Sequence, residues 1–108
     1  MSTHGFTWPG RIRDDLDHDL IAAYLAIDIQ KSPEWAKELL QKTDEVKSGE
    51  IDSWERVGNA YCLCLFRDHV EIEENYEEQP AEPVKVSIDD FRAAAAAWLR
   101  FVEQRGQT

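Results

Sequence analysis

Residues 61–73, which read Tyr-Cys-Leu-Cys-Leu-Phe-Arg-Asp-His-Val-Glu-Ile-Glu, set the fold class of this chain. The apolar run of residues 61–66 is too short for a free-standing helix and is typical of a strand buried on both faces. Residues 67–69 are polar and suit a turn. The segment that follows alternates apolar and acidic side chains, as a strand with one wet face does. The pattern therefore predicts an antiparallel β-hairpin.

The chain before the hairpin shows helical periodicity. Residues 1–10 lack it and read as an irregular lead-in, and a first helix is predicted over about residues 14–29, with aspartates in its first turn. Ser32 suits an N-cap and Pro33 the first helical position, so a second helix begins there and ends at Gly49. The apolar series of the first helix consists of Leu16, Leu20, Ala23 and Ile27, and its apolar face is widened by Ile21, Tyr24 and Leu25.

After the hairpin the chain has a loop over residues 74–83, a short third strand at residues 84–86, and a helix that Ser87 caps and Gly106 ends. The expected fold is α+β: one domain over residues 1–108, with two N-terminal helices, an antiparallel hairpin of two or three strands, and a C-terminal helix packed on the sheet. The predicted core consists of Trp35, Leu39, Tyr61, Leu63, Leu65, Val70, Ile72, Phe91, Trp98 and Val102.

The formal net charge of −10 is unevenly placed along the chain. From Asp44 to Asp90 the acids outnumber the bases by ten, and in the rest of the chain the two signs cancel. Residues 71–82 carry six glutamates and no base. A field of this sign repels nucleic acid and anionic membranes and attracts basic partners.

Cysteine and histidine would be the first residues recruited by a catalytic or metal site. Cys62 and Cys64 share one face of a strand, where a disulfide between them would strain the backbone. Within an apolar run, such thiols are expected to pack in the core rather than react or bind a metal. His18 lies among aspartates that fan out around a helix start, so it is expected to be solvated. Because phosphate-loop, HExxH, GxSxG and zinc-type spacings do not occur in the sequence, we expect no enzyme, no cofactor and no metal.

The composition also bears on location. No window approaches the roughly 20 apolar residues that a membrane span needs. The first ten residues do not have the layout of a secretory signal. Together with two reduced thiols, this predicts a cytoplasmic protein.

The glutamate run suggests a docking surface for a basic partner, in which aromatic anchors and electrostatic steering act together. Trp54 and Tyr76 would supply the aromatic part. A competing interpretation is that Glu71 and Glu73 only protect an exposed edge strand from unwanted pairing. The candidate partner-binding residues are Asp68, Glu71, Glu73, Glu74, Tyr76, Glu77, Glu78 and Glu82.

Two family resemblances bear on function. Residues 53–61, Ser-Trp-Glu-Arg-Val-Gly-Asn-Ala-Tyr, and the later runs 88–91 and 101–104 resemble small bacterial YacL-like proteins, whose function is unassigned. The plan of a hairpin, an acidic loop and a final helix is also similar to small immunity proteins of polymorphic and contact-dependent toxin systems. That resemblance implies a cytoplasmic, non-catalytic protein that neutralises a toxin domain, often a basic nuclease.

Three functions follow as hypotheses. The first is an immunity protein that binds and neutralises a cognate, basic nuclease toxin through its acidic surface. The second is a YacL-like housekeeping protein that binds an unknown basic partner. The third is a small enzyme, which a pocket holding a metal or carboxylates with perturbed pKa values would favour.

Overall fold

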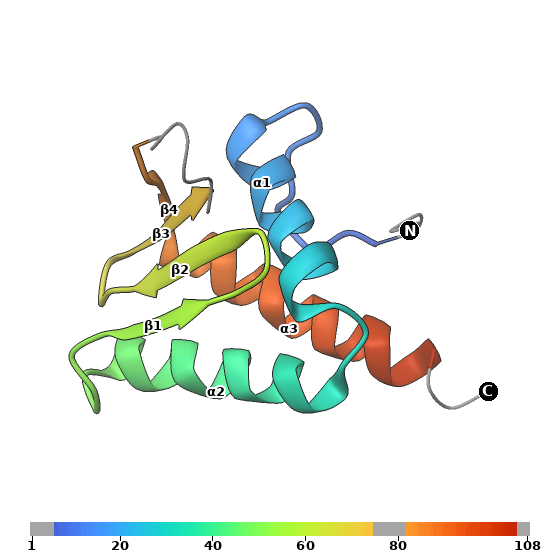
Figure 1. Cartoon of the computed structure of the whole chain (residues 1–108). Helices are drawn as coiled ribbons and strands as arrows, with labels where there is room; N and C mark the ends of the chain where they lie inside the picture. The colour runs from blue at the N-terminus through green and yellow to red at the C-terminus, as the bar shows by residue number, and fades with distance from the viewer. Residues whose placement is uncertain (1–5, 75–81, 106–108) are drawn as a thin grey trace.

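The computed structural model describes residues 6–74 and 82–105, and within them it contains three α-helices, a π-helical turn and one four-stranded sheet (Figure 1). The predicted α+β class is confirmed, with helices first, then the sheet, then the C-terminal helix. In chain order the elements are α1 (Leu16–Tyr24), η1 (Leu25–Ile29), α2 (Pro33–Ser48), β1 (Trp54–Val57), β2 (Tyr61–Leu65), β3 (His69–Glu74), β4 (Val84–Ser87) and α3 (Ile88–Arg105).

Each of the three α-helices is preceded by a residue whose side chain accepts a hydrogen bond from a free backbone N–H group of the first turn. The Asp15 carboxylate accepts from two N–H groups of the first turn of α1. The hydroxyls of Ser32 and Ser87 each accept from the N–H three residues later. Gly49 ends α2 with a left-handed φ of 87°. The boundaries predicted at Ser32, Gly49 and Ser87 are therefore confirmed, whereas Gly106 lies outside the described residues.

The predicted inward face of the first helix is correct for Ile21, Tyr24 and Leu25 and wrong for Leu16 and Ile27. Leu16 is 82% exposed and Ile27 is 44% exposed. The helix is instead followed by the π-helical turn η1, in which the N–H of Gln30 donates to the carbonyl of Leu25, five residues earlier. The side chains that this arrangement turns inward are Ile21, Ala22, Tyr24, Leu25 and Ile29.

The sheet is antiparallel with the strand order β1-β2-β3-β4. The predicted hairpin is β2–β3, and the predicted third strand is β4; both are confirmed. His69 begins β3 instead of belonging to the turn. Strand β1 was not predicted, and it pairs with β2 so that Glu55 lies opposite Cys64.

The core lies between the inner face of the sheet and the helices, with α3 running behind the sheet in Figure 1. Nine of the ten predicted core residues are buried, and Trp35 is the exception at 43% exposed. Its ring instead carries the Arg56 guanidinium at 5.2 Å. In the lead-in, Phe6 and Trp8 are buried, and Phe6 packs edge-on against Trp98 with ring centroids 4.8 Å apart.

In the part of the chain that the structure describes, no helix combines the length and apolar character needed to cross a bilayer.

Candidate functional site on the outer face of the sheet

The sheet has a second face, which we call the outer face, that points away from the core. Side chains on it alternate with the buried ones, and in β2 they are the half-buried Cys62 and Cys64. The prediction that this strand is buried on both faces is therefore wrong, and so is the prediction that its thiols lie in the core. The strand register places these residues together on the outer face: Glu55, Val57, Cys62, Cys64, Glu71, Glu73 and Lys85.

His69 joins two of the predicted partner-binding acids at one end of the outer face. Its Nδ1 lies 2.7 Å from Asp68 Oδ1, and its Nε2 lies 2.9 Å from Glu71 Oε2. Phe66 stacks on the imidazole at 4.8 Å. These hydrogen bonds to two carboxylates raise the pKa of His69, and the same contact lowers the pKa of Asp68. Two of the predicted binding acids thus already share one imidazole as a hydrogen-bond partner within the chain.

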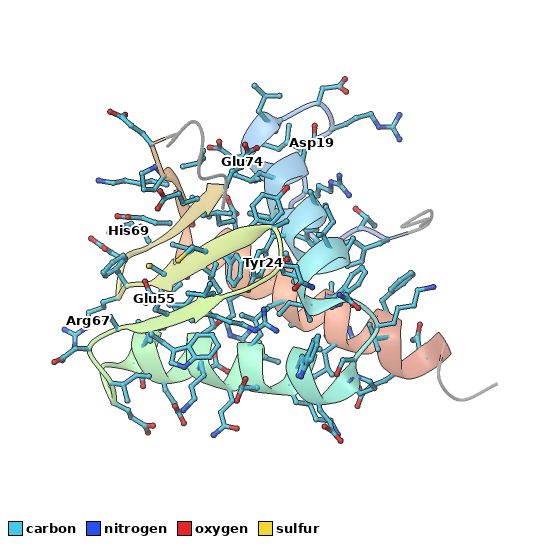
Figure 2. The ribbon with its side chains drawn as sticks, in the orientation of Figure 1. Asp19, Tyr24, Glu55, Arg67, His69 and Glu74 are labelled. Carbon is cyan, nitrogen blue, oxygen red and sulfur yellow. The ribbon has the colours of Figure 1, made fainter. Side chains whose placement is uncertain are left out.

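The remaining predicted acids occupy the outer face and one end of the sheet. Glu73 is half-buried on the outer face beside Cys62. Glu74 and Glu82 are exposed and stand at the two ends of the segment that joins β3 to β4. In Figure 2, Glu74 and Asp19 of α1 both lie near the top of the view. Helix α1 packs against β4. Of the predicted site, Tyr76, Glu77 and Glu78 lie outside the described residues.

The charge on the outer face is less uniform than the sequence run indicates. The register sets Lys85 of β4 opposite Glu71 of β3. Lys85 also contributes to the lowered pKa of Asp68. The uncompensated acids among the described part of the predicted site are therefore Glu73, Glu74 and Glu82.

The edge-protection interpretation of Glu71 and Glu73 is wrong. Strand β3 is hydrogen-bonded to β2 on one side and to β4 on the other, so it is an interior strand. The acids of an interior strand cannot serve to discourage pairing at an edge. Their charge on the outer face needs another explanation.

A thiol and carboxylate cluster lies in the middle of the outer face. The Sγ atoms of Cys62 and Cys64 each lie 3.6 Å from Oε2 of Glu55, and both thiols donate to that oxygen. Burial, followed for Cys62 by the Glu55 carboxylate, raises the pKa of both thiols, to about 12 for Cys64. Figure 2 shows Glu55 and His69 on the side of the sheet that carries the sulfur atoms. Sequence reasoning missed this cluster because it depends on the pairing of the unpredicted strand β1.

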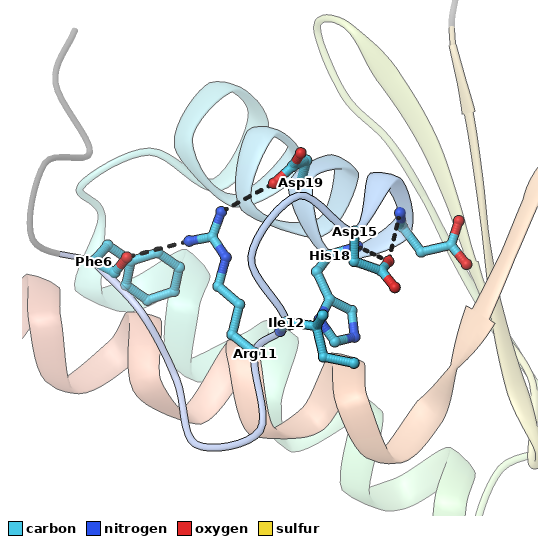
Figure 3. Close-up of polar contacts among 7 residues, drawn as sticks. Phe6, Arg11, Ile12, Asp15, His18 and Asp19 are labelled. Atoms are coloured by element: carbon cyan, nitrogen blue, oxygen red, sulfur yellow. Dashed lines mark hydrogen bonds and ion pairs between the residues drawn. The ribbon is translucent and has the colours of Figure 1, made fainter.

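His18 is buried at 5% exposed, so the prediction of a solvated side chain is wrong (Figure 3). The N–H of Ile12 donates to His18 Nδ1 at 2.9 Å, which leaves the proton on Nε2 to face Asp90 at 3.2 Å. The nearby acids do not converge on it: Asp15 caps α1, and Asp19 pairs with Arg11. His18 therefore joins the lead-in to α3.

A buried polar cluster gives several residues of the run 53–61 a structural role. The Asp28 carboxylate, 1% exposed, accepts from the N–H groups of Ala60 and Tyr61 at 2.9 and 3.0 Å. Gly58 lies so close to Asp28 that a Cβ atom there would overlap the carboxylate. Burial raises the pKa of the Tyr24 hydroxyl, which lies beside the Arg56 guanidinium. These residues fasten η1 to the β1–β2 turn, which is a structural role.

Comparisons with known proteins place the chain in a family. Residues 8–90 match the model of UPF0231, described as an uncharacterised protein family. A UPF0231 protein of Shewanella oneidensis is 25% identical over 105 residues, covering 82% of this chain and 83% of that protein. No solved structure matches the chain.

These matches correct the resemblances drawn from the sequence. The resemblance to immunity proteins is wrong, since the matching family is UPF0231 and nothing in the comparisons indicates a toxin system. The YacL-like resemblance is likewise not shown. The toxin-neutralising role loses its support with the resemblance that suggested it. The match begins at residue 8 and so includes both N-terminal helices as well as the sheet. The chain belongs to the UPF0231 family of uncharacterised proteins.

Proposed function

We propose that this protein is a non-catalytic binding protein whose outer sheet face and adjoining acidic end dock a partner with a basic surface. The observation that carries the proposal is the position of the acids on an interior strand and at the ends of the β3–β4 segment. There they neither protect an edge nor, for Glu74 and Glu82, take part in an ion pair within the described residues.

Charge and geometry both favour a basic protein as the partner. Acids of one sign gathered at one end of a sheet raise the local concentration of cationic groups and speed diffusional encounter. The same field disfavours nucleic acid and anionic membranes. The proposal also keeps the cytoplasmic location expected from the sequence, which two free thiols support.

Charge reversal tests the proposal. We expect the double variant Glu74→Lys/Glu82→Lys to lose capture of basic proteins from a lysate of the source cells, compared by quantitative mass spectrometry with the wild-type protein. Folding should be unchanged, because exposed carboxylates contribute little to stability. Binding of each captured protein, once purified, should weaken as salt rises, since charges are screened beyond about 8 Å at physiological ionic strength.

The matched control is Glu38→Lys/Glu50→Lys, which changes the net charge equally at two exposed sites away from the sheet's acidic end. We expect it to capture the same basic proteins as the wild type. Equal losses in both variants would show that only total charge matters. Unchanged capture by Glu74→Lys/Glu82→Lys would contradict the proposed surface.

A further inference from the structure

The outer face holds three potential metal ligands, and they form a feature separate from the acidic docking surface. One ligand atom each from Glu55, Cys62 and Cys64 can be chosen so that all three lie within 4.8 Å of one another. The two Sγ atoms lie 3.6 Å from the same carboxylate oxygen. All three side chains reach the cluster from hydrogen-bonded strands, so the backbone holds them in place.

The arrangement follows from strand geometry. Residues two apart on a strand share a face, which aligns the two thiols. Pairing of Glu55 with Cys64 brings the carboxylate from the neighbouring strand to the same side. Because β2 lies between β1 and β3, neither thiol can swing away with a loose loop.

Other uses of two neighbouring thiols fit less well. Their Cα atoms are separated by two strand steps of about 3.3 Å each, which is near the upper limit for a disulfide, and their Cβ atoms point the same way. A nucleophilic cysteine needs a stabilised thiolate. Here both thiols donate to the Glu55 carboxylate, and an anionic neighbour does not stabilise a thiolate.

The sulfur-to-oxygen spacing matches that of a tetrahedral zinc site. With a Zn–S distance of about 2.3 Å and a Zn–O distance of about 2.1 Å, a sulfur and an oxygen ligand stand about 3.6 Å apart. The Sγ to Oε2 separations have this value before any ion is bound. Two sulfurs and one oxygen suit a borderline-soft ion, whereas Mg²⁺ and Ca²⁺ prefer oxygen alone.

We propose that Glu55, Cys62 and Cys64 bind one zinc-like divalent cation, with water or Glu73 as the fourth ligand. Glu73 lies opposite Cys62 in the register, so one further carboxylate favours a cation at this position. Binding replaces the two S–H protons, which leave to solvent, and forms two metal–thiolate bonds and one metal–carboxylate bond. This inference goes beyond the docking function and does not depend on it.

Cobalt is a suitable probe because Co²⁺ bound by thiolates absorbs light and colourless Zn²⁺ displaces it. We expect the reduced, metal-free full chain to bind one Co²⁺ with thiolate-to-cobalt charge-transfer and visible d–d bands, and to lose both on addition of Zn²⁺. The double variant Cys62→Ser/Cys64→Ser should lose the bands, and Glu55→Gln should bind at least tenfold more weakly. Glu38→Gln, which changes an exposed acid of α2 away from the sheet, is the control and should bind as the wild type does.

A second measurement uses only the wild-type protein and so stands even if a cysteine variant fails to fold. Saturating Zn²⁺ should slow alkylation of both Cys62 and Cys64 at least tenfold, as followed by mass spectrometry, and Mg²⁺ should not. Absence of charge-transfer bands, or unchanged alkylation under saturating Zn²⁺, would overturn the proposal. Loss of basic-partner capture with intact cobalt binding would concern only the docking function.

Discussion

At the scale of single residues, His69 makes the stability of the sheet depend on pH. Its contacts with Asp68 and Glu71 raise its pKa, so the folded state binds the proton more tightly than the unfolded chain does. The resulting stabilisation is complete below the unfolded pKa of about 6.5 and is lost as pH rises through the folded value. Asp68 behaves in the opposite way: its lowered pKa gives stabilisation that is lost as pH falls through its folded value.

The contact should therefore stabilise the protein most between about pH 4 and pH 6.5. We expect His69→Gln to reduce the midpoint of urea unfolding at pH 5.5 and to have a smaller effect at pH 9. NMR titration of the wild type should show the His69 imidazole with a pKa above that of a free histidine. A substitution whose cost is the same at both pH values would show that the imidazolium contributes nothing.

Single residues also account for two of the wrong predictions. The burial of His18 depends on Ile12 and on Asp90, which is 72 residues away in the chain, so no local pattern could indicate it. Trp35 is at a core position of its helical stripe, but the side chain that covers it is Arg56 from the unpredicted strand β1. Sequence periodicity shows which side chains of a helix share an apolar face, but it does not show which residues from distant parts of the chain pack against that face.

At the scale of elements, a double-mutant cycle can test the contact that Asp28 makes between η1 and the β1–β2 turn. We expect Asp28→Ala to lower the free energy of unfolding by roughly 1–3 kcal/mol, since two backbone N–H groups lose their acceptor. Gly58→Ala should also destabilise, because its Cβ meets the carboxylate. The double variant should lose less unfolding free energy than the two single variants lose together, because without the Asp28 carboxylate the new Cβ atom has nothing to overlap. Chemical denaturation measures all four proteins, and strict additivity would contradict the contact.

The elements that could be predicted carry strong local signals. Capped helices at Ser32 and Ser87 and the alternation of β3 are readable from a few adjacent residues. Strand β1 has only four residues, with the charged Arg56 pointing to the core side, so its sequence gives no alternation to detect. The sequence was enough to single out the acids of the candidate site. Whether β3 is an edge or an interior strand depends on the order of the strands in the sheet, which a local sequence pattern does not contain.

At the scale of the whole molecule, α3 connects the parts of the core. Phe91 and Trp98 are almost fully buried, and the Trp98 indole N–H donates to the Gln30 carbonyl at 2.8 Å while its ring packs on Phe6. We expect Phe91→Ala or Trp98→Ala to lower the free energy of unfolding by roughly 3–5 kcal/mol. Thermal unfolding followed by circular dichroism checks this. Arg100→Ala, at an exposed position of the same helix, is the control and should change little.

The π-helical turn has a consequence for how this chain can change by mutation. A π turn contains one residue more than an α-helical turn, so deleting one residue, such as Ala26, would restore ordinary helical pairing. Every side chain before the gap would then be rotated by about 100° relative to those after it. Asp28 and the buried face of α1 could no longer both meet their partners. In genetic terms, this segment tolerates substitution more readily than loss of a single codon, and its length is a property on which the fold depends.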